Sequence, residues 1–169
     1  EPKELIQNGL ENVKMGFDRA LDGLTAEELK WQPRPDANSI GLIFFHSIRT
    51  EDSTIHSLQG KPQIWESEKW YQKFHKAIDD TGAHYLAEQV ASFVVPDLKE
   101  SLTYADAVRK DTFEYLKGLR AEDFDRKVAL PPRPAPTPTP DGRPAPPRPP
   151  INPLVGSRLM MLVTHLSQH

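Results

Sequence analysis

The chain has 169 residues, of which 27% are charged and 37% hydrophobic, and this composition predicts one soluble globular domain, residues 1–169, with enough length for a core. Its 21 basic and 24 acidic residues give a net charge of −3, which argues against a nucleic-acid-binding protein. Cysteine is absent, no apolar run reaches the roughly 18 residues that span a bilayer, and no signal peptide is visible, so the sequence argues against disulfides, cysteine ligands and a membrane protein.

Four long helices are predicted, and the first two lie in the N-terminal third of the chain. The first covers residues 2–21, with Pro2 in its first turn and one apolar stripe at helical spacing. The second covers residues 39–58, and Asn38 or Ser39 could cap it. Residues 40–45 are apolar on nearly all sides, so we expect that end of the second helix to be deeply buried.

The third helix is predicted over residues 95–119, with Pro96 at its start and Gly118 at its end. The fourth begins near Asn152 and is still helical in pattern at His169, so we expect the natural chain to continue. Its apolar residues recur at helical spacing: Leu154, Leu159, Met161, Leu162 and Leu166.

Two other segments separate these helices. An aromatic-rich stretch between the second and third helices predicts short helices packed over one end of a bundle: Trp65, Trp70, Tyr71, Phe74 and Tyr85. Residues 131–153 contain twelve prolines in 23 positions, which favours an extended loop. We interpret it as an inserted surface loop, although it could also bind a partner that recognises proline-rich peptides. The predicted fold is therefore all-α, a four-helix bundle with this loop between helices three and four.

A faint internal repeat supports two similar halves. Residues 24–29 (LTAEEL) resemble residues 119–124 (LRAEDF), and each follows a long helix; Thr25 and Glu28 have capping-box spacing. His46 lies 22 positions after the first copy. His165 lies 23 positions after the second copy once residues 131–153 are removed, so each half would deliver a histidine to an equivalent place.

His165 and His169 are the one pair among the six histidines with obvious metal-ligand spacing. Residues four apart on a helix share a face, so both rings could reach a single ion. Met161 and Leu162 precede His165 by four and three positions, which predicts that the pair points inward. A pair on the helix surface without a role is the alternative interpretation.

His46 lies in the most apolar helix and shares a face with Leu42, Ile43 and Thr50. A lone histidine in such a place is more often a core residue with a hydrogen-bond partner. Packing of the second helix against the fourth, parallel or antiparallel, could instead bring it to the pair, and bundle cores often hold metal sites built from facing helices.

The sequence resembles the DinB-like superfamily, also described as DinB/YfiT-like metalloenzymes. The likeness rests on WQPRP at residues 31–35, NSIG at 38–41 followed by His46, DTG at 80–82, the helix of Tyr104, and THLSQH at 164–169. It covers nearly the whole chain outside the proline-rich stretch. Two departures are the length of that stretch and the absence of the segment with a Gly-Gln pair that usually follows the last histidine.

The resemblance implies a four-helix bundle, often a homodimer, with one divalent metal ion, nickel or zinc, held at positions matching His46, His165 and His169. It also implies that members with known activity join low-molecular-weight thiols to electrophiles or isomerise substrates with a thiol cofactor. The two departures bear on the pocket wall and the dimer interface rather than on the three ligands.

Three histidine ligands leave a coordination position open, as in catalytic sites, whereas structural zinc sites are usually closed by four protein ligands. The ion could generate hydroxide from water near neutral pH or hold a thiol as thiolate. Because the chain has no cysteine, any thiol must come from a cofactor or substrate. Imidazole suits several metals, so the residues do not name the ion.

Other polar residues are weaker candidates, and none is assigned as a catalytic acid or base. Glu51 and Asp52 could orient a ligand or accept a proton, but a solvated face or an ion pair with Arg49 is the favoured interpretation. We expect the remaining histidines to be surface or packing residues and the tryptophans mainly to pack: His56, His75, His84, Trp31, Trp65 and Trp70.

The leading hypothesis is a metal-dependent enzyme that acts on a small molecule, as a thiol-dependent S-transferase or a hydrolase. The alternatives are a non-enzymatic metal-binding or stress-response protein and an interaction module that uses the proline-rich stretch. We expect a cytoplasmic protein that binds neither nucleic acid nor membrane. The name of the family is no reason to infer a role in DNA damage.

Overall fold

The computed structural model describes residues 2–129 and 152–169, and helices make up the secondary structure of these two ranges apart from one isolated β-bridge. In chain order the helices are α1 (Pro2–Leu21), α2 (Ala26–Leu29), α3 (Ile40–Gln59), α4 (Ile64–Ser67), α5 (Trp70–Lys73), α6 (Ala87–Ala91), α7 (Leu98–Gly118), the 3-10 helix η1 (Ala121–Asp125) and α8 (Val155–Ser167). The proline-rich stretch, apart from Asn152 and Pro153, lies outside the described residues.

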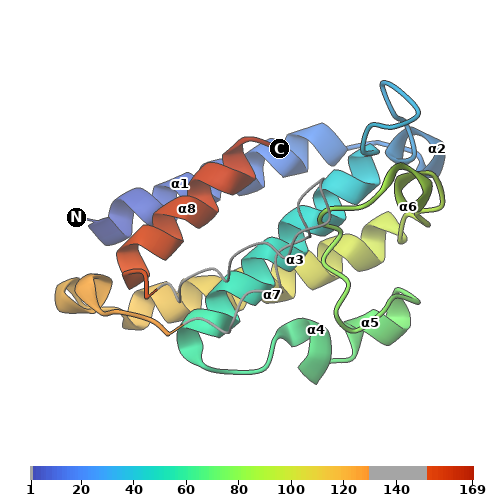
Figure 1. Cartoon of the computed structure of the whole chain (residues 1–169). Coiled ribbons are helices and arrows are strands. Elements are labelled where there is room, and N and C mark those ends of the chain that lie inside the picture. Colours follow the sequence, from blue (N-terminus) through green and yellow to red (C-terminus); the bar gives the residue numbers. More distant parts are fainter. Residues whose placement is uncertain (1, 130–151) are drawn as a thin grey trace, which may run out of the picture.

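The four long helices form a bundle, as the sequence predicted. Figure 1 shows α1 and α8 side by side, with α3 and α7 as the other pair and α3 running opposite to α8. Of the two packing directions that the sequence left open, antiparallel packing of α3 and α8 is the one adopted. It brings the first half of α3 beside the last turn of α8.

The ends of α3 follow from its flanking residues. Ser39 is extended, and its hydroxyl accepts a hydrogen bond from the backbone N–H of Leu42 at 3.1 Å, which satisfies a donor that the helix cannot. Gly60 ends the helix in the left-handed conformation, with φ of 67° and its N–H bonded to the carbonyl of His56. Most of the apolar start of α3 is buried, as predicted, namely Gly41, Leu42, Phe44 and Phe45, whereas Ile40 and Ile43 are partly exposed.

Two helices begin three residues later than their sequence patterns suggest. Asp97 caps α7 by accepting from the N–H of Glu100, so Pro96 lies before the cap rather than in the first turn. At α8, the N–H of Val128 donates to the carbonyl of Pro153, and the N–H of Val155 donates to the carbonyl of Arg126. This short pairing, outside any helix, keeps the chain extended until Val155.

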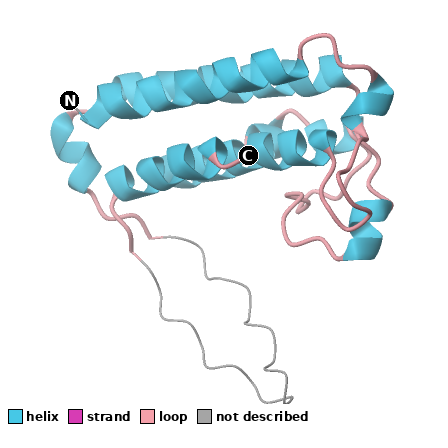
Figure 2. Cartoon of the chain, turned by 90° about the horizontal axis from the view of Figure 1, so that it is seen from above, coloured by secondary structure: helices cyan, strands magenta, loops and turns pink. Residues whose placement is uncertain are grey.

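The predicted short helices between the long ones are α4, α5 and α6. With the loops that join them, they gather toward the end of the bundle at which α3 begins (Figure 2). Trp65 and Trp70 are buried there against Tyr104 of α7, with ring centroids 5.7 and 5.3 Å apart. Trp31 does not pack in the same way, since 59% of its surface is exposed.

The apolar core consists of two clusters along the bundle, one on each side of a buried polar layer from the middle of α3. Asp52 is fully buried in this layer and accepts hydrogen bonds from the backbone N–H groups of Ile64 and Trp65, at 3.0 and 2.9 Å. These N–H groups begin α4, whose own N-cap residue supplies no side-chain bond. The carboxylate of α3 therefore caps α4 and ties the aromatic segment to the bundle.

The two copies of the internal repeat share one capping hydrogen bond, although the first begins an α-helix and the second a 3-10 helix. In the first, the side chain of Glu28 accepts from the N–H of Thr25 at 2.8 Å before the short helix α2. In the second, the side chain of Asp123 accepts from the N–H of Arg120 at 2.9 Å before η1. The carboxylate three positions on satisfies the same donor in each copy, which is the bond a capping box predicts.

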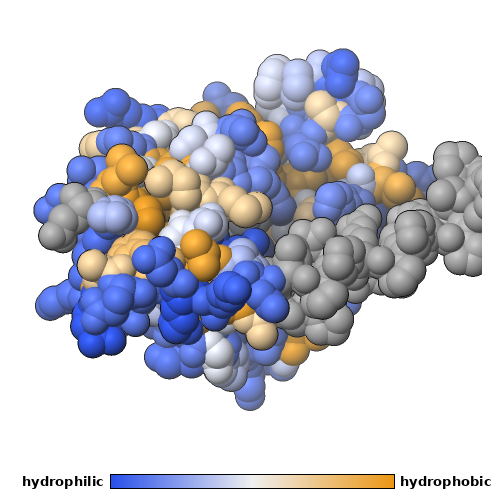
Figure 3. Space-filling view, turned by 60° about the vertical axis from the view of Figure 1, so that its left-hand side comes forward, coloured by the Kyte–Doolittle hydropathy of each residue, from blue (hydrophilic) through white to orange (hydrophobic). Residues whose placement is uncertain are grey.

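On the face seen in Figure 3, hydrophobic residues lie in patches between hydrophilic ones. A mixed surface of this kind is ordinary, because apolar atoms make up more than half of the surface of most folded proteins. Within residues 2–129 and 152–169, none of the helices combines the length and the apolar character that crossing a membrane requires.

Candidate metal centre

Three histidines from distant parts of the sequence meet where α3 faces the end of α8. The Nε2 atom of His165 lies 3.1 Å from Nε2 of His46 and 3.2 Å from Nε2 of His169. In the part of the chain that the structure describes, they are the one group of three or more histidine or acidic side chains that could hold a metal ion. The structure thus brings together all three residues singled out in the sequence.

The ring of His46 is fixed from the side opposite the cluster. Its Nδ1 lies 2.9 Å from the carbonyl oxygen of Thr81, which can only accept, so Nδ1 carries the proton. In the neutral ring, Nε2 then keeps a free lone pair that faces the other two histidines. A backbone carbonyl behind a histidine is a common way to set both the tautomer and the orientation of a metal ligand.

The neighbouring loop holds that carbonyl close to His46. Gly82, with φ of 68°, adopts a conformation that favours glycine. A Cβ atom at this position would lie 2.9 Å from the ring of Phe45 and 3.3 Å from Cβ of His46. Glycine is therefore needed here both for the backbone conformation and for the close approach of the loop to α3.

The pKa values of His165 and His169 are lowered from the ordinary histidine value. Burial is the main cause for both, and the charge of His46 adds to it; for His169 the charge of His165 adds as well. A lowered pKa keeps these imidazoles neutral near pH 7. Neutral imidazole is the form that binds a metal ion.

The distances from Nε2 of His165 to Nε2 of His46 and of His169 fit binding to one ion. Two nitrogens bound at about 2.0–2.1 Å to a tetrahedral ion lie about 3.3–3.4 Å apart, and octahedral binding places them at about 2.9 Å. The observed 3.1 and 3.2 Å fall between these values. Three converging lone pairs would repel one another or need shared protons, so a cation between them is the arrangement that this donor set suits.

The pair from α8 differs from the prediction in two respects. The helix ends at Ser167, so His169 follows the helix, although its ring still reaches that of His165. The pair is also not buried: His165 is half-buried and His169 exposed. Met161, expected on the inner stripe, is 60% exposed, because Leu159, Leu162 and Leu166 form the buried face. The cluster therefore lies at the edge of the bundle, within reach of solvent.

Glu51 and Asp52 lie outside the cluster, yet the expected solvated face is wrong for both. The carboxylate of Glu51 is buried and accepts from the guanidinium of Arg109, at 2.7 and 2.6 Å, and from the hydroxyl of Thr112. Asp52 forms the suggested pair with Arg49, at 3.3 Å, within the buried polar layer. Both carboxylates therefore form structural hydrogen bonds and ion pairs inside the bundle.

The remaining histidines do not join the cluster. His56 is buried, with Nδ1 2.8 Å from a carboxylate oxygen of Asp52, while His75 and His84 are exposed. Sequence reasoning missed the role of Thr81, since a backbone carbonyl has no signature of its own. It also gave no role to Thr50, whose hydroxyl lies 3.5 Å from Nε2 of His46.

The match to a family model agrees with the fold and the histidines. The model of the DinB superfamily matches residues 10–169. A solved structure of a conserved protein from Enterococcus faecalis has a TM-score of 0.72 and 22% sequence identity, and the alignment covers 98% of this chain and 91% of the other. That likeness shows the fold alone.

None of the curated proteins matches. With a family match over more than nine-tenths of its length and a bundle that carries the three histidines, the chain belongs to the DinB superfamily.

Proposed function

We propose that this protein is a metal-dependent enzyme that acts on a small molecule, with transfer of a thiol sulfur to an electrophile as its reaction. The observation that supports the proposal most is the convergence of three imidazole nitrogens at the solvent-accessible edge of the bundle. Three neutral ligands leave at least one position for water or substrate. When bound, a divalent ion such as nickel or zinc supplies Lewis acidity, which favours loss of a proton from a thiol or a water.

The chain's own residues hold and shape this site. Thr81 fixes the ring of His46 through its carbonyl oxygen, and the hydroxyl of Thr50 lies at the edge of the cluster, where it can donate to a bound ligand. Glu51 and Asp52, the acidic residues closest in sequence to His46, are occupied by Arg109, Thr112, Tyr104 and backbone donors.

The absence of a carboxylate from the cluster, among the residues described, favours a thiol over water as the nucleophile. An ordinary thiol has a pKa near 8.5, so modest stabilisation of its anion gives thiolate at neutral pH. The pKa of water is far higher than that of a thiol, so the ion must lower it much further before hydroxide forms near neutral pH. In the proposed reaction the thiol releases its proton to solvent, sulfur forms a bond to carbon of the electrophile, and the leaving group departs with its electron pair.

The reaction is tested with protein reloaded with nickel or zinc, supplied with 2-mercaptoethanol and a chromogenic aryl chloride. We expect metal-dependent formation of the thioether, lost in His165→Ala and retained in His75→Ala, which removes an exposed histidine outside the cluster. The same preparations are assayed with a 4-nitrophenyl ester. Metal-dependent ester cleavage without thioether formation would replace the transferase by a hydrolase, and failure of both reactions in metal-loaded protein would contradict the proposal.

A further inference from the structure

A groove beside the histidine cluster is lined mainly by hydrophobic residues. It lies between α1, the start of α3 and the end of α8, has a volume of about 510 Å³, and reaches His169. Most of its walls are hydrophobic, including Val13, Phe17, Leu21, Ile40, Ile43 and Phe44. Its polar members are Asn12, Ser167 and His169, and none of the described residues that line it is acidic, lysine or arginine. The volume is within the range of about 300–1,000 Å³ that small-molecule sites occupy.

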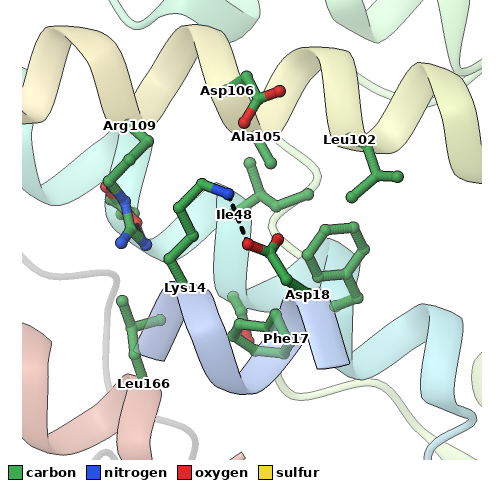
Figure 4. Close-up of a pocket in the computed structure, with 12 residues that line it drawn as sticks. Lys14, Phe17, Asp18, Ile48, Leu102, Ala105, Asp106, Arg109 and Leu166 are labelled. Atoms are coloured by element: carbon green, nitrogen blue, oxygen red, sulfur yellow. Dashed lines mark hydrogen bonds and ion pairs between the residues drawn. The ribbon is translucent and has the colours of Figure 1, made fainter. Parts of the chain in front are cut away.

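A second cavity lies behind the wall that Phe17, Phe44 and Leu166 form, and its lining, unlike that of the groove, includes charged residues. Figure 4 shows Lys14 and Asp18 of α1 in this cavity, joined at 2.7 Å, with Asp106 and Arg109 of α7 across from them. Its volume of about 40 Å³ would hold about three water molecules, since each needs roughly 10–15 Å³. It is therefore too small for an organic ligand, and its charged residues do not line the groove.

The groove and the cluster share residues and a helix face. His169 belongs to both. Ile43 precedes His46 by three residues on α3, so the two side chains project from neighbouring turns of the same face. A ligand whose head group reaches the histidine nitrogens would therefore extend its remaining atoms along the groove.

We propose that the groove holds the uncharged, apolar part of the substrate, an alkyl or aryl chain whose polar head group reaches the three histidines. This inference rests on the proposed function and assigns the class of molecule on which the metal centre acts. A charged or polyhydroxylated body would lose its water in the groove without finding partners, which is unfavourable. An alkyl chain gains affinity with every methylene group that it buries there.

Gly16 of α1 lines the groove without a side chain. A Cβ atom built at this position meets no atom within 4 Å, so a larger side chain would enter open space without displacing the core. Gly16→Leu should therefore fill part of the groove in a folded protein. Gly16→Ala is the matched control, because it makes the same change in the helix backbone and adds a single methyl group.

The first experiment titrates cobalt-loaded protein with ethanethiol, butanethiol and hexanethiol, and follows the thiolate-to-metal absorption. We expect affinity to rise about fourfold per added methylene, hence about 250-fold over the four methylenes that separate ethanethiol from hexanethiol. Gly16→Leu should reduce this ratio to less than about tenfold while ethanethiol binds as in the parent, and Gly16→Ala should preserve it. Equal affinity for the three thiols, or a ratio that Gly16→Leu leaves unchanged, would overturn the proposal.

A second experiment separates the groove from the metal centre. Hexan-1-ol is titrated into metal-free protein, and the NMR signals of the methyl groups of Ile40, Ile43 and Leu166 are followed. Shifts in the parent that Gly16→Leu abolishes would support the groove even if no thiol absorption appeared with metal, in which case the proposed function alone would fail. No shifts in the parent would overturn the groove proposal whatever the metal does. If the parent were a dimer that did not bind the alcohol and that Gly16→Leu dissociated, the groove would be an interface between two copies and the groove proposal would be overturned.

Discussion

At the scale of single residues, the position of His46 depends on a segment that the sequence does not connect with it. Thr81 lies 35 positions away and acts through its backbone carbonyl, which every residue type possesses. The local signal is instead Gly82, whose positive φ and contact with His46 allow the loop to approach α3. We therefore expect Gly82 to affect metal affinity, although it lies far from the three ligands in sequence.

Gly82→Ala should weaken metal binding by about 10- to 100-fold, because the new Cβ would press on Phe45 and His46 and displace the carbonyl that orients the ligand. Gly60→Ala is the control, since Gly60 has nearly the same φ, 67°, but no atom within 4 Å of the built Cβ. Competition with a chromophoric chelator measures both affinities. If the two variants lost affinity equally, general backbone strain would explain the effect and the assigned role of Gly82 would be wrong.

The spacing of His165 and His169 is a local property of one helix, so the residues alone indicated that pair, whereas His46 was assigned to it through the resemblance to the DinB-like superfamily. It could not place Glu51 and Asp52, since charge alone favours exposure and their partners come from α4 and α7. Burial of these acids depends on several donors that meet them in three dimensions. The candidate site was therefore easier to predict from residue type than the buried polar layer was.

At the scale of elements, α8 shows which features of a helix its own sequence determines. The stripe of Leu159, Leu162 and Leu166 correctly predicted the buried face of α8. Including Met161 made the predicted face too wide, because its side chain is exposed. The start of α8 was missed because the segment before it pairs with residues 126–128, a contact between distant parts of the chain. Contacts of this kind leave no periodic pattern.

The packing of α8 against α1 depends on a glycine. A Cβ atom at Gly9 would lie 2.6 Å from a methyl group of Val163, whereas one at Gly16 meets open space. Gly9→Ala should reduce the free energy of unfolding by about 1–3 kcal/mol, because α1 must move away from α8. Gly16→Ala should raise it by about 0.5–1 kcal/mol through helix propensity alone.

Urea unfolding of the two variants beside the parent measures this difference between two positions of one helix. Since α8 carries His165, we also expect Gly9→Ala to bind metal more weakly than Gly16→Ala does. Equal stability of the two variants would show that the close contact between Gly9 and Val163 does not limit the packing of the helices.

At the scale of the whole molecule, the buried polar layer links stability to pH. Burial acts to lower the pKa of His56, but its hydrogen bonds with Asp52 and the charges of Asp52 and Asp111 outweigh burial, so the pKa is raised. Burial acts to raise the pKa of Asp52, but hydrogen bonds from His56, Tyr104 and the N–H of Trp65 outweigh it, so the pKa is lowered. Protonated His56 and ionised Asp52 therefore stabilise the fold together.

The free energy of unfolding of the metal-free protein should fall as pH rises above about 6.5, because folded His56 keeps a proton that the unfolded chain has lost. The lowered pKa values of His165 and His169 also link stability to pH, but below about pH 6.5. There the free energy of unfolding falls as pH falls, which is the opposite direction. Urea unfolding between pH 6.5 and 8 should show the decline in the parent and a smaller one in His56→Gln. The same slope in both proteins would mean that His56 is not the group responsible.

The most direct test of the account is the metal content of the tag-free protein, measured by elemental mass spectrometry beside His46→Ala, His165→Ala and the control His75→Ala. We predict close to one equivalent of nickel or zinc in the parent and in His75→Ala, and loss of most of it in the two variants of the cluster. A parent that holds no metal even after reloading, or that keeps its metal when His46 or His165 is removed, would contradict the assignment of the three histidines as a metal centre.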